Sequence, residues 1–134
     1  MVPLHLHPRS PELFVVVSGR LLTETVPESG VLDAEGNQRV IRTELGPGKM
    51  TVFPMGSFHT QVNPDCEPAV AVAGFTSEDP GAGAVVSQAL SMSDGVVQGS
   101  FGQDAGKLRD GVAKGALVMM EECAKKCGLE KRRV

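Results

Sequence analysis

The chain has 134 residues and a formal net charge of −3, which fits one domain with enough residues to bury a core without help from disulfides. The slight acidic excess argues against a nucleic-acid partner, because no basic field would attract phosphates. No apolar run approaches the ~20 residues of a membrane-spanning helix, so we expect no membrane partner either.

The first part of the chain has the pattern of a mainly β domain. Short runs rich in Val, Phe and Thr predict strands at 13–17, 20–25, 38–45, 50–53, 58–63 and 69–75. Turns rich in Gly and Pro separate these runs, notably residues 27–37 and 46–48. Short strands at this spacing indicate a β-sandwich or barrel.

The chain changes character near residue 79. Asp79 followed by Pro80 is typical of a helix start, so we expect a short helix over residues 82–90. Residues 91–111 are rich in Gly, Ser and Asp and predict one or two weak helical turns.

A last helix is predicted near the C-terminal end. Small and apolar residues recur at helical spacing from Ala113 to Cys127, and Gly128 is suited to end the helix. We therefore divide the chain into a β-barrel over residues 1–78 and a helical extension over residues 79–134. The extension would pack on its own barrel or on a neighbouring subunit.

The cysteines give no strong signal. Cys123 and Cys127 are four residues apart, a spacing that suits a disulfide between them poorly on a regular helix. A zinc site would need two more ligands nearby, and the histidines lie elsewhere. We expect Cys66, Cys123 and Cys127 to be free thiols, buried or lightly exposed.

The histidines give the strongest functional signal. His5 and His7 are two residues apart, and residues so spaced on a strand point to the same face. Pro8 and Pro11 interrupt that strand, which allows the Glu12 carboxylate to point to the same side. His59 is the only other histidine. Three imidazoles and one carboxylate suit a divalent first-row metal, and on a six-coordinate ion they leave two positions for water, dioxygen or substrate.

Two motifs in the sequence resemble those of the cupin superfamily. The first is His5-x-His7-x4-Glu12-x6-Gly19, and the second is Gly48-x5-Pro54-x-Gly56-x2-His59-x3-Asn63. Within that superfamily the chain is similar to the germin and spherulin group, particularly to fungal spherulin-like proteins. The similarity includes the segments at 63–69 and 77–81 and the helical tail with its late cysteines.

The resemblance implies a cupin jelly-roll β-barrel with C-terminal helices. It implies that His5, His7, Glu12 and His59 bind one metal per chain, with Glu12 and His59 also assigned to catalysis. Manganese is the usual ion of germins, while these ligand types also allow iron, nickel or zinc. The resemblance further implies a homo-oligomer, a dimer or a trimer of dimers, in which C-terminal helices clasp neighbouring subunits.

The chain departs from the family pattern at its beginning. His5 comes almost at once, whereas the family has a glycine and several strands before the first ligand. We expect part of the jelly roll to be missing, and a partner subunit to cover the sheet edge this would expose. As written, the chain has no secretion signal and is expected to be cytoplasmic. An extracellular location is expected instead if such a signal has been lost.

Strand parity outlines a substrate pocket. Gln61 and Asn63 share the phase of His59, and Phe14 shares the phase of Glu12. Together with Phe53 they are our predicted substrate-binding residues. For Gln61 an interior amide is an equal alternative, and for Asn63 a turn-forming role is favoured. Phe58 and Phe75 are further candidates for the pocket wall, whereas Arg9 is expected to be a solvated loop residue.

Two functions remain open at this point. The first is an enzyme acting on a small carboxylate or dicarbonyl substrate, since several germins oxidise oxalate or dismutate superoxide. The chain has no Tyr or Trp for a one-electron route, which favours a redox-neutral step such as isomerisation, dehydration or cyclisation, or chemistry of the metal alone. The second is a non-catalytic, metal-stabilised stress or structural protein of the spherulin type. A sugar-binding cupin without metal is weaker, because such members commonly lose ligands.

Overall fold

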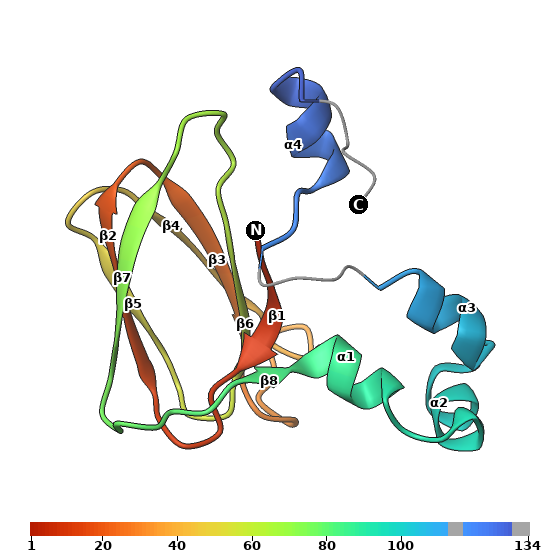
Figure 1. The fold of residues 1–134 in the computed structure, drawn as a ribbon. Coiled ribbons are helices and arrows are strands. Elements are labelled where there is room, and N and C mark those ends of the chain that lie inside the picture. Colours follow the sequence, from red (N-terminus) through yellow and green to blue (C-terminus); the bar gives the residue numbers. More distant parts are fainter. Residues whose placement is uncertain (113–116, 130–134) are drawn as a thin grey trace.

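The computed structural model describes residues 1–112 and 117–129 (Figure 1). Two antiparallel sheets face each other and form a β-sandwich. The larger sheet has the order β4-β3-β6-β1-β8 and the smaller one the order β5-β2-β7. The strands are β1 (Val2–Leu6), β2 (Glu12–Ser18), β3 (Leu21–Val26), β4 (Ile41–Leu45), β5 (Met50–Phe53), β6 (Phe58–Val62), β7 (Val70–Phe75) and β8 (Gly83–Ala84).

The core lies between the two sheets. It consists of Phe14, Val16, Leu21, Leu45 and Phe53, all buried. Alternation along the strands explains this set, because every second side chain of β2 and β3 points inward. The mainly β fold expected from the sequence is confirmed.

Gly19 makes the turn from β2 to β3 possible. Its φ of 77° lies in the left-handed region, and a Cβ there would come within 2.8 Å of Ala69. Only glycine fits both the backbone angle and the close approach of the neighbouring segment. This explains the glycine that ends the first motif.

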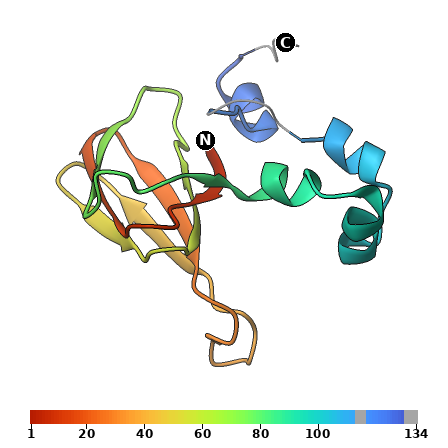
Figure 2. The ribbon, with the colours of Figure 1, turned by 60° about the horizontal axis from the view of Figure 1, so that its bottom comes forward.

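Helices α1 (Val85–Leu90), α2 (Asp94–Phe101) and α3 (Ala105–Asp110) extend away from the sandwich beside β8 (Figures 1 and 2). They bury a small core of their own around Leu90, Val97 and Ala105. The Arg109 guanidinium donates to the carbonyl of Leu90 at 2.8 Å and to the Asp94 carboxylate at 2.7 Å. Among the described helices, none is long and apolar enough to cross a membrane.

The expected start of the first helix was wrong. Helix α1 begins at Val85, because Gly83 and Ala84 pair with β1 as a short strand. Asp79 does not cap a helix. Its carboxylate accepts hydrogen bonds from Arg9 at 2.6 Å and from the Gly81 amide at 3.2 Å, which shapes a turn. The weak helical turns expected between residues 91 and 111 are formed by α2 and α3.

The last helix is shorter than predicted. Residues 117–120 are not helical, and α4 spans Glu121–Lys126. Residues 113–116 of the expected helix lie outside the described residues. Gly128 has a φ of 63°, as expected for a residue that ends a helix.

The expectation that all three cysteines are free was also wrong. Cys66, in the turn between β6 and β7, forms a disulfide with Cys127 at the end of α4. Sequence spacing gave no hint of this bond, since 61 residues separate the partners. Cys123 is a free thiol and lies one helical turn before Cys127. The disulfide ties α4 to the sandwich, together with a hydrogen bond of 2.8 Å from the Lys126 ammonium to the Pro64 carbonyl.

We predict that this disulfide contributes about 2–4 kcal/mol to the free energy of unfolding, because it closes a long loop in the unfolded chain. The double variant Cys66→Ser/Cys127→Ser should show that loss in urea denaturation. Cys123→Ser is the matched control and should unfold at the wild-type midpoint. A double variant as stable as the wild type under oxidising conditions would contradict the assignment.

Candidate metal centre

Both sheets contribute to one cluster of ionisable side chains inside the sandwich. His5 on β1 lies opposite His59 on β6 in the larger sheet. Glu12 begins β2 in the smaller sheet, where it pairs with Phe53 on one side and Phe75 on the other. The cluster therefore exists only when the two sheets face each other.

His7 follows directly after β1 and is held by the second sequence motif. Its carbonyl accepts a hydrogen bond from the Gly56 amide at 2.9 Å. Gly56 belongs to the Pro54–Gly56 segment that precedes His59. The two motifs, about fifty residues apart in sequence, are thus hydrogen-bonded to each other next to the site.

The four side chains converge closely. One ligand atom from each of His5, His7, Glu12 and His59 lies within 4.8 Å of all the others. The Nε2 atoms of His7 and His59 lie 3.0 and 3.1 Å from Oε2 of Glu12. The ring centroids of His5 and His59 are 4.2 Å apart. The arrangement predicted from the sequence, with all four side chains at one point, is present.

Backbone carbonyls fix the orientation of all three imidazole rings. The Nδ1 atoms of His5, His7 and His59 lie 2.9, 2.6 and 2.9 Å from the carbonyl oxygens of Pro3, Gly81 and Ser57, respectively. A carbonyl oxygen only accepts hydrogen bonds, so each Nδ1 must carry the proton and donate it. In the neutral ring, Nε2 then has a free lone pair.

This tautomer makes the centre of the cluster a site for a cation. The Nε2 lone pairs of His7 and His59 both face the same oxygen of Glu12, which also only accepts when ionised. Acceptors at about 3 Å repel one another unless a proton or a metal ion lies between them. Three nitrogens and a carboxylate oxygen around one point are donors that divalent first-row metals bind. The residues present therefore fit such an ion.

Burial keeps part of this site neutral. Desolvation lowers the pKa of His5 below its usual value of 6.5, and the electrostatic effect of the neighbouring His59 and His7 rings lowers it further. The hydrogen bond to Pro3 and the Glu12 charge act in the opposite direction without reversing it. A neutral imidazole at ordinary pH is the form that can bind a metal.

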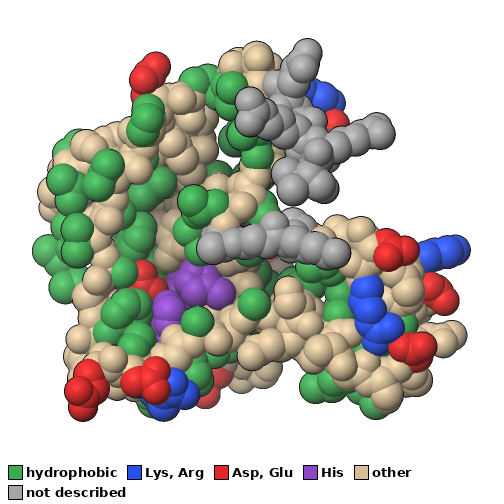
Figure 3. Space-filling view, in the orientation of Figure 1, with side chains coloured by type: hydrophobic (Ala, Val, Ile, Leu, Met, Phe, Trp, Pro, Cys, Tyr) green, Lys and Arg blue, Asp and Glu red, His purple; other side chains and the backbone are tan. Residues whose placement is uncertain are grey.

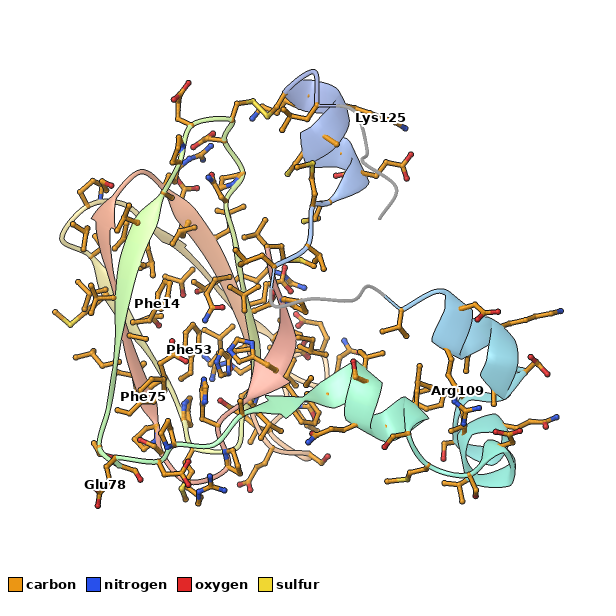
Figure 4. All side chains as sticks on the ribbon, in the orientation of Figure 1. Phe14, Phe53, Phe75, Glu78, Arg109 and Lys125 are labelled. Atoms are coloured by element: carbon orange, nitrogen blue, oxygen red, sulfur yellow. A yellow bond between two sulfur atoms is a disulfide. The ribbon has the colours of Figure 1, made fainter. Side chains whose placement is uncertain are left out.

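Aromatic rings surround the cluster (Figure 4). Phe53 stacks on His59 with a centroid distance of 4.2 Å and an interplanar angle of 8°, and Phe75 meets His7 edge-on at 4.7 Å. Phe14 lies behind Phe53, 5.9 Å away. Phe58, also considered for the wall, is 41% exposed because it points to the opposite side of β6 from His59.

The polar residues predicted beside the site have different surroundings. Gln61 is buried, and among the described residues its side-chain oxygen has no hydrogen-bond partner. Both polar atoms of the Asn63 amide are engaged in a turn, with the Asp65 amide at 2.9 Å and the Glu67 carbonyl at 2.8 Å. Arg9 is exposed and forms an ion pair with Asp79, which matches the expected loop role.

The cluster is open on one side. Figure 3 shows the histidine side chains at the surface of the molecule, in an opening edged by hydrophobic side chains. His5 and His7 are half-buried, whereas Glu12 and His59 are 4% and 1% exposed. A small molecule therefore has a route to the histidine side of the centre.

The carbonyls that orient the rings were not found from the sequence. Pro3, Ser57 and Gly81 act through their backbone oxygens, which every residue has, so residue type carries no signal for them. A partial clue was present for two of them. Pro3 and Ser57 each lie two residues before the histidine that they orient.

Comparison with known proteins shows the family of the chain. The sequence model of the cupin family matches residues 1–107. The chain belongs to the cupin family. The resemblance of the two motifs to germins and spherulins is confirmed by relatives of both kinds.

Two relatives illustrate the relationship. Spherulin-1A of Physarum polycephalum is 34% identical over 128 residues, which are 92% of this chain and 49% of the spherulin. A germin-like protein of Arabidopsis thaliana, subfamily 1 member 7, is 43% identical over 79 residues, which are 59% of this chain and 32% of that protein. The chain thus spans about half the length of the spherulins that it matches.

Solved structures share the fold at lower identity. An oxalate oxidase matches with a TM-score of 0.68 and 24% identity, over 80% of this chain and 53% of the other. An oxalate decarboxylase of Bacillus subtilis matches with a TM-score of 0.75 and 17% identity, over 90% of this chain and 30% of the other. At these identities the similarity shows a cupin fold for this chain, and no more.

Because burial lowers the pKa of His5, we predict that acid destabilises the protein when no metal is bound. Below about pH 6.5 the unfolded chain binds a proton at His5 that the folded chain resists, so the free energy of unfolding falls as the pH drops. Urea denaturation of the metal-free protein at about pH 7 and about pH 5 measures this loss. The loss should be smaller in His5→Gln. Equal losses in the two proteins would show that His5 is not the group responsible.

Proposed function

We propose that this cupin binds one divalent first-row metal through His5, His7, Glu12 and His59 and acts on a small oxygenated substrate, a carboxylate or a dicarbonyl compound. Manganese is the first candidate, followed by iron, nickel and zinc. The observation that carries the proposal is the orientation of the rings. Three hydrogen-bonded Nδ1–H groups leave three Nε2 lone pairs free, and those of His7 and His59 face the Glu12 carboxylate.

The substrate class follows from the surroundings of the site. A metal bound there would supply a Lewis acid for a carboxylate or carbonyl oxygen, or an electron carrier for dioxygen. Phe53 and Phe75 line the centre with apolar surface, which excludes water and strengthens electrostatic attraction to an anionic oxygen. The three imidazole ligands are neutral, so the Glu12 carboxylate alone offsets the charge of a bound dication. The centre would keep a net positive charge, which favours an anionic substrate.

Gln61 is the best candidate among the chain's own residues for contact with a substrate. Its buried side-chain oxygen has no partner within the described residues, and leaving such an acceptor unsatisfied costs about 1–3 kcal/mol. A hydroxyl group or a water molecule at the metal would satisfy it. Phe53 supplies apolar contact, with Phe14 packed behind it. Asn63 is the weakest of the predicted substrate residues, because its amide already shapes a turn.

A non-catalytic, metal-stabilised protein of the spherulin type is our second candidate. It is supported by the similarity to Spherulin-1A over 92% of the chain. In this role the metal would stabilise the sandwich by joining the two sheets. We also propose that the chain is a homo-oligomer, and its expected cytoplasmic location stays a prediction.

Replacement of His59 tests the ligand set. We predict that His59→Ala lowers the metal content from near one per chain to near zero, because it removes a nearly fully buried ligand. Metal analysis by mass spectrometry after dialysis measures this. Phe58→Ala is the matched control, because Phe58 is next to His59 in the chain but its side chain points away from the site. Metal near one per chain in His59→Ala would show that the ligand assignment is wrong.

Activity assays separate the two candidates. An enzyme should turn over at least one small carboxylate or dicarbonyl compound, and a screen with oxalate, superoxide and small 2-oxo and 2-hydroxy acids covers the main classes. In that case Gln61→Leu should retain the metal and lower kcat/KM by about 10–100-fold. No turnover by metal-loaded protein, combined with a large loss of thermal stability on metal removal, would favour the structural role.

A further inference from the structure

The three cysteines of the chain meet at one place, far from the histidine cluster. The disulfide joins Cys66, in the turn after β6, to Cys127 at the end of α4, and Figure 4 shows the bond where that turn meets the helix. Cys123 is the third cysteine and is a free thiol. All three line one cavity of about 340 Å³. A free thiol and a disulfide therefore share the same space.

The turn after β6 holds Cys66 close to the free thiol as well as to its bonded partner. The Sγ atom of Cys123 lies 3.8 Å from the carbonyl oxygen of Asn63, where the turn begins. The Asn63 side-chain amide donates to the Glu67 carbonyl at 2.8 Å, which closes the turn around Cys66. Helix α4 thus contacts one short turn through two cysteines, Cys123 near its start and Cys127 at the disulfide.

Helical spacing decides which sulfur can change partners. The Cys127 amide donates to the Cys123 carbonyl at 3.0 Å, so the two cysteines lie one helical turn apart on the same face. Their Cβ atoms are then about 5–6 Å apart, whereas a disulfide needs about 3.5–4.5 Å. A bond between them does not suit the helix. Cys66 lies on a different segment, so it is the sulfur that either cysteine of α4 can bind.

We propose that the three cysteines form a thiol–disulfide exchange site, in which Cys66 passes from Cys127 to Cys123 and back. The Cys123 thiolate attacks the Sγ atom of Cys66, and the bond between Cys66 and Cys127 breaks as the new bond forms. Cys127 leaves with the electron pair and takes a proton from water, which replaces the proton that Cys123 lost to water. One disulfide and one thiol are present before and after, so the step needs no oxidant or reductant.

The exchange changes which part of α4 is held on the sandwich. The two disulfides attach points of the helix one turn, ~5.4 Å, apart, and Met119 and Met120, which lead into α4, line the same cavity. Met119 is 53% exposed, so the cavity is open to solvent and a small thiol can reach the sulfurs. The metal takes no part in this chemistry, so the proposal does not depend on the function proposed above.

The test maps the disulfides of the metal-loaded protein after incubation with reduced and oxidised glutathione at about pH 8, where ordinary thiols are partly ionised. Acid stops the exchange, N-ethylmaleimide blocks free thiols, and trypsin cleaves after Lys125 and Lys126, which puts Cys123 and Cys127 on different peptides. In the wild type, mass spectrometry should find Cys66 bonded to Cys127 in most chains and to Cys123 in at least about 1% of them. Non-reducing electrophoresis excludes bonds between chains.

Two variants test the choice of partner. Cys127→Ser should form the bond between Cys66 and Cys123 in most chains, with the circular dichroism and metal content of the wild type. Cys66→Ser is the matched control, because it also leaves two cysteines, and these should not pair in the folded helix. In concentrated urea the same control should form the bond between Cys123 and Cys127, since short loops close most readily in an unfolded chain.

Three results would overturn the proposal. The first is a folded Cys127→Ser in which Cys66 and Cys123 stay unpaired or bind glutathione separately. The second is a wild type in which Cys66 is bonded to Cys127 alone after equilibration with glutathione, a measurement that requires no variant to fold. The third is a folded Cys66→Ser that pairs its two cysteines as readily as Cys127→Ser does, because pairing would then not depend on the turn after β6.

Discussion

The site depends on one constraint, namely that three histidine rings are held by backbone carbonyls. Because Pro3, Ser57 and Gly81 each accept an Nδ1–H, the metal-binding nitrogens have no rotational choice. A metal that binds here meets ligands already oriented, and the entropy of ordering them has been lost at folding. The same constraint brings two lone pairs against the Glu12 carboxylate, so the folded chain without a cation contains a local repulsion.

Neighbouring parts of the sandwich hold those carbonyls in place. Ser57 is positioned by the turn after Pro54, whose Gly56 amide binds His7. Gly81 lies before β8, which pairs with β1 beside His5. Phe53 joins the core to the site, since its ring stacks on His59 and also lies 5.9 Å from the ring of Phe14, at a tilt of 50°. Core packing and ligand orientation are therefore coupled through a single aromatic ring.

Much of this could be predicted from the sequence, for identifiable reasons. The strands carry strong alternation, and the ligands stand at fixed spacings in two motifs, so the fold class and the four converging side chains were accessible. The Cys66–Cys127 disulfide was not, because only the tertiary fold brings α4 to the β6–β7 turn. The start of α1 was misplaced because pairing of residues 83 and 84 with β1 overrides the local helix signal at Asp79 and Pro80.

The most direct test of this account is the protonation state of the three imidazole rings. Long-range ¹H–¹⁵N NMR spectra of the protein, recorded with and without zinc as a diamagnetic ion, distinguish Nδ1 from Nε2 in each ring. The account predicts protonated Nδ1 in His5, His7 and His59 in both spectra, with zinc shifting the three Nε2 signals. A protonated Nε2 in the neutral metal-free rings, or zinc bound through any Nδ1, would contradict it.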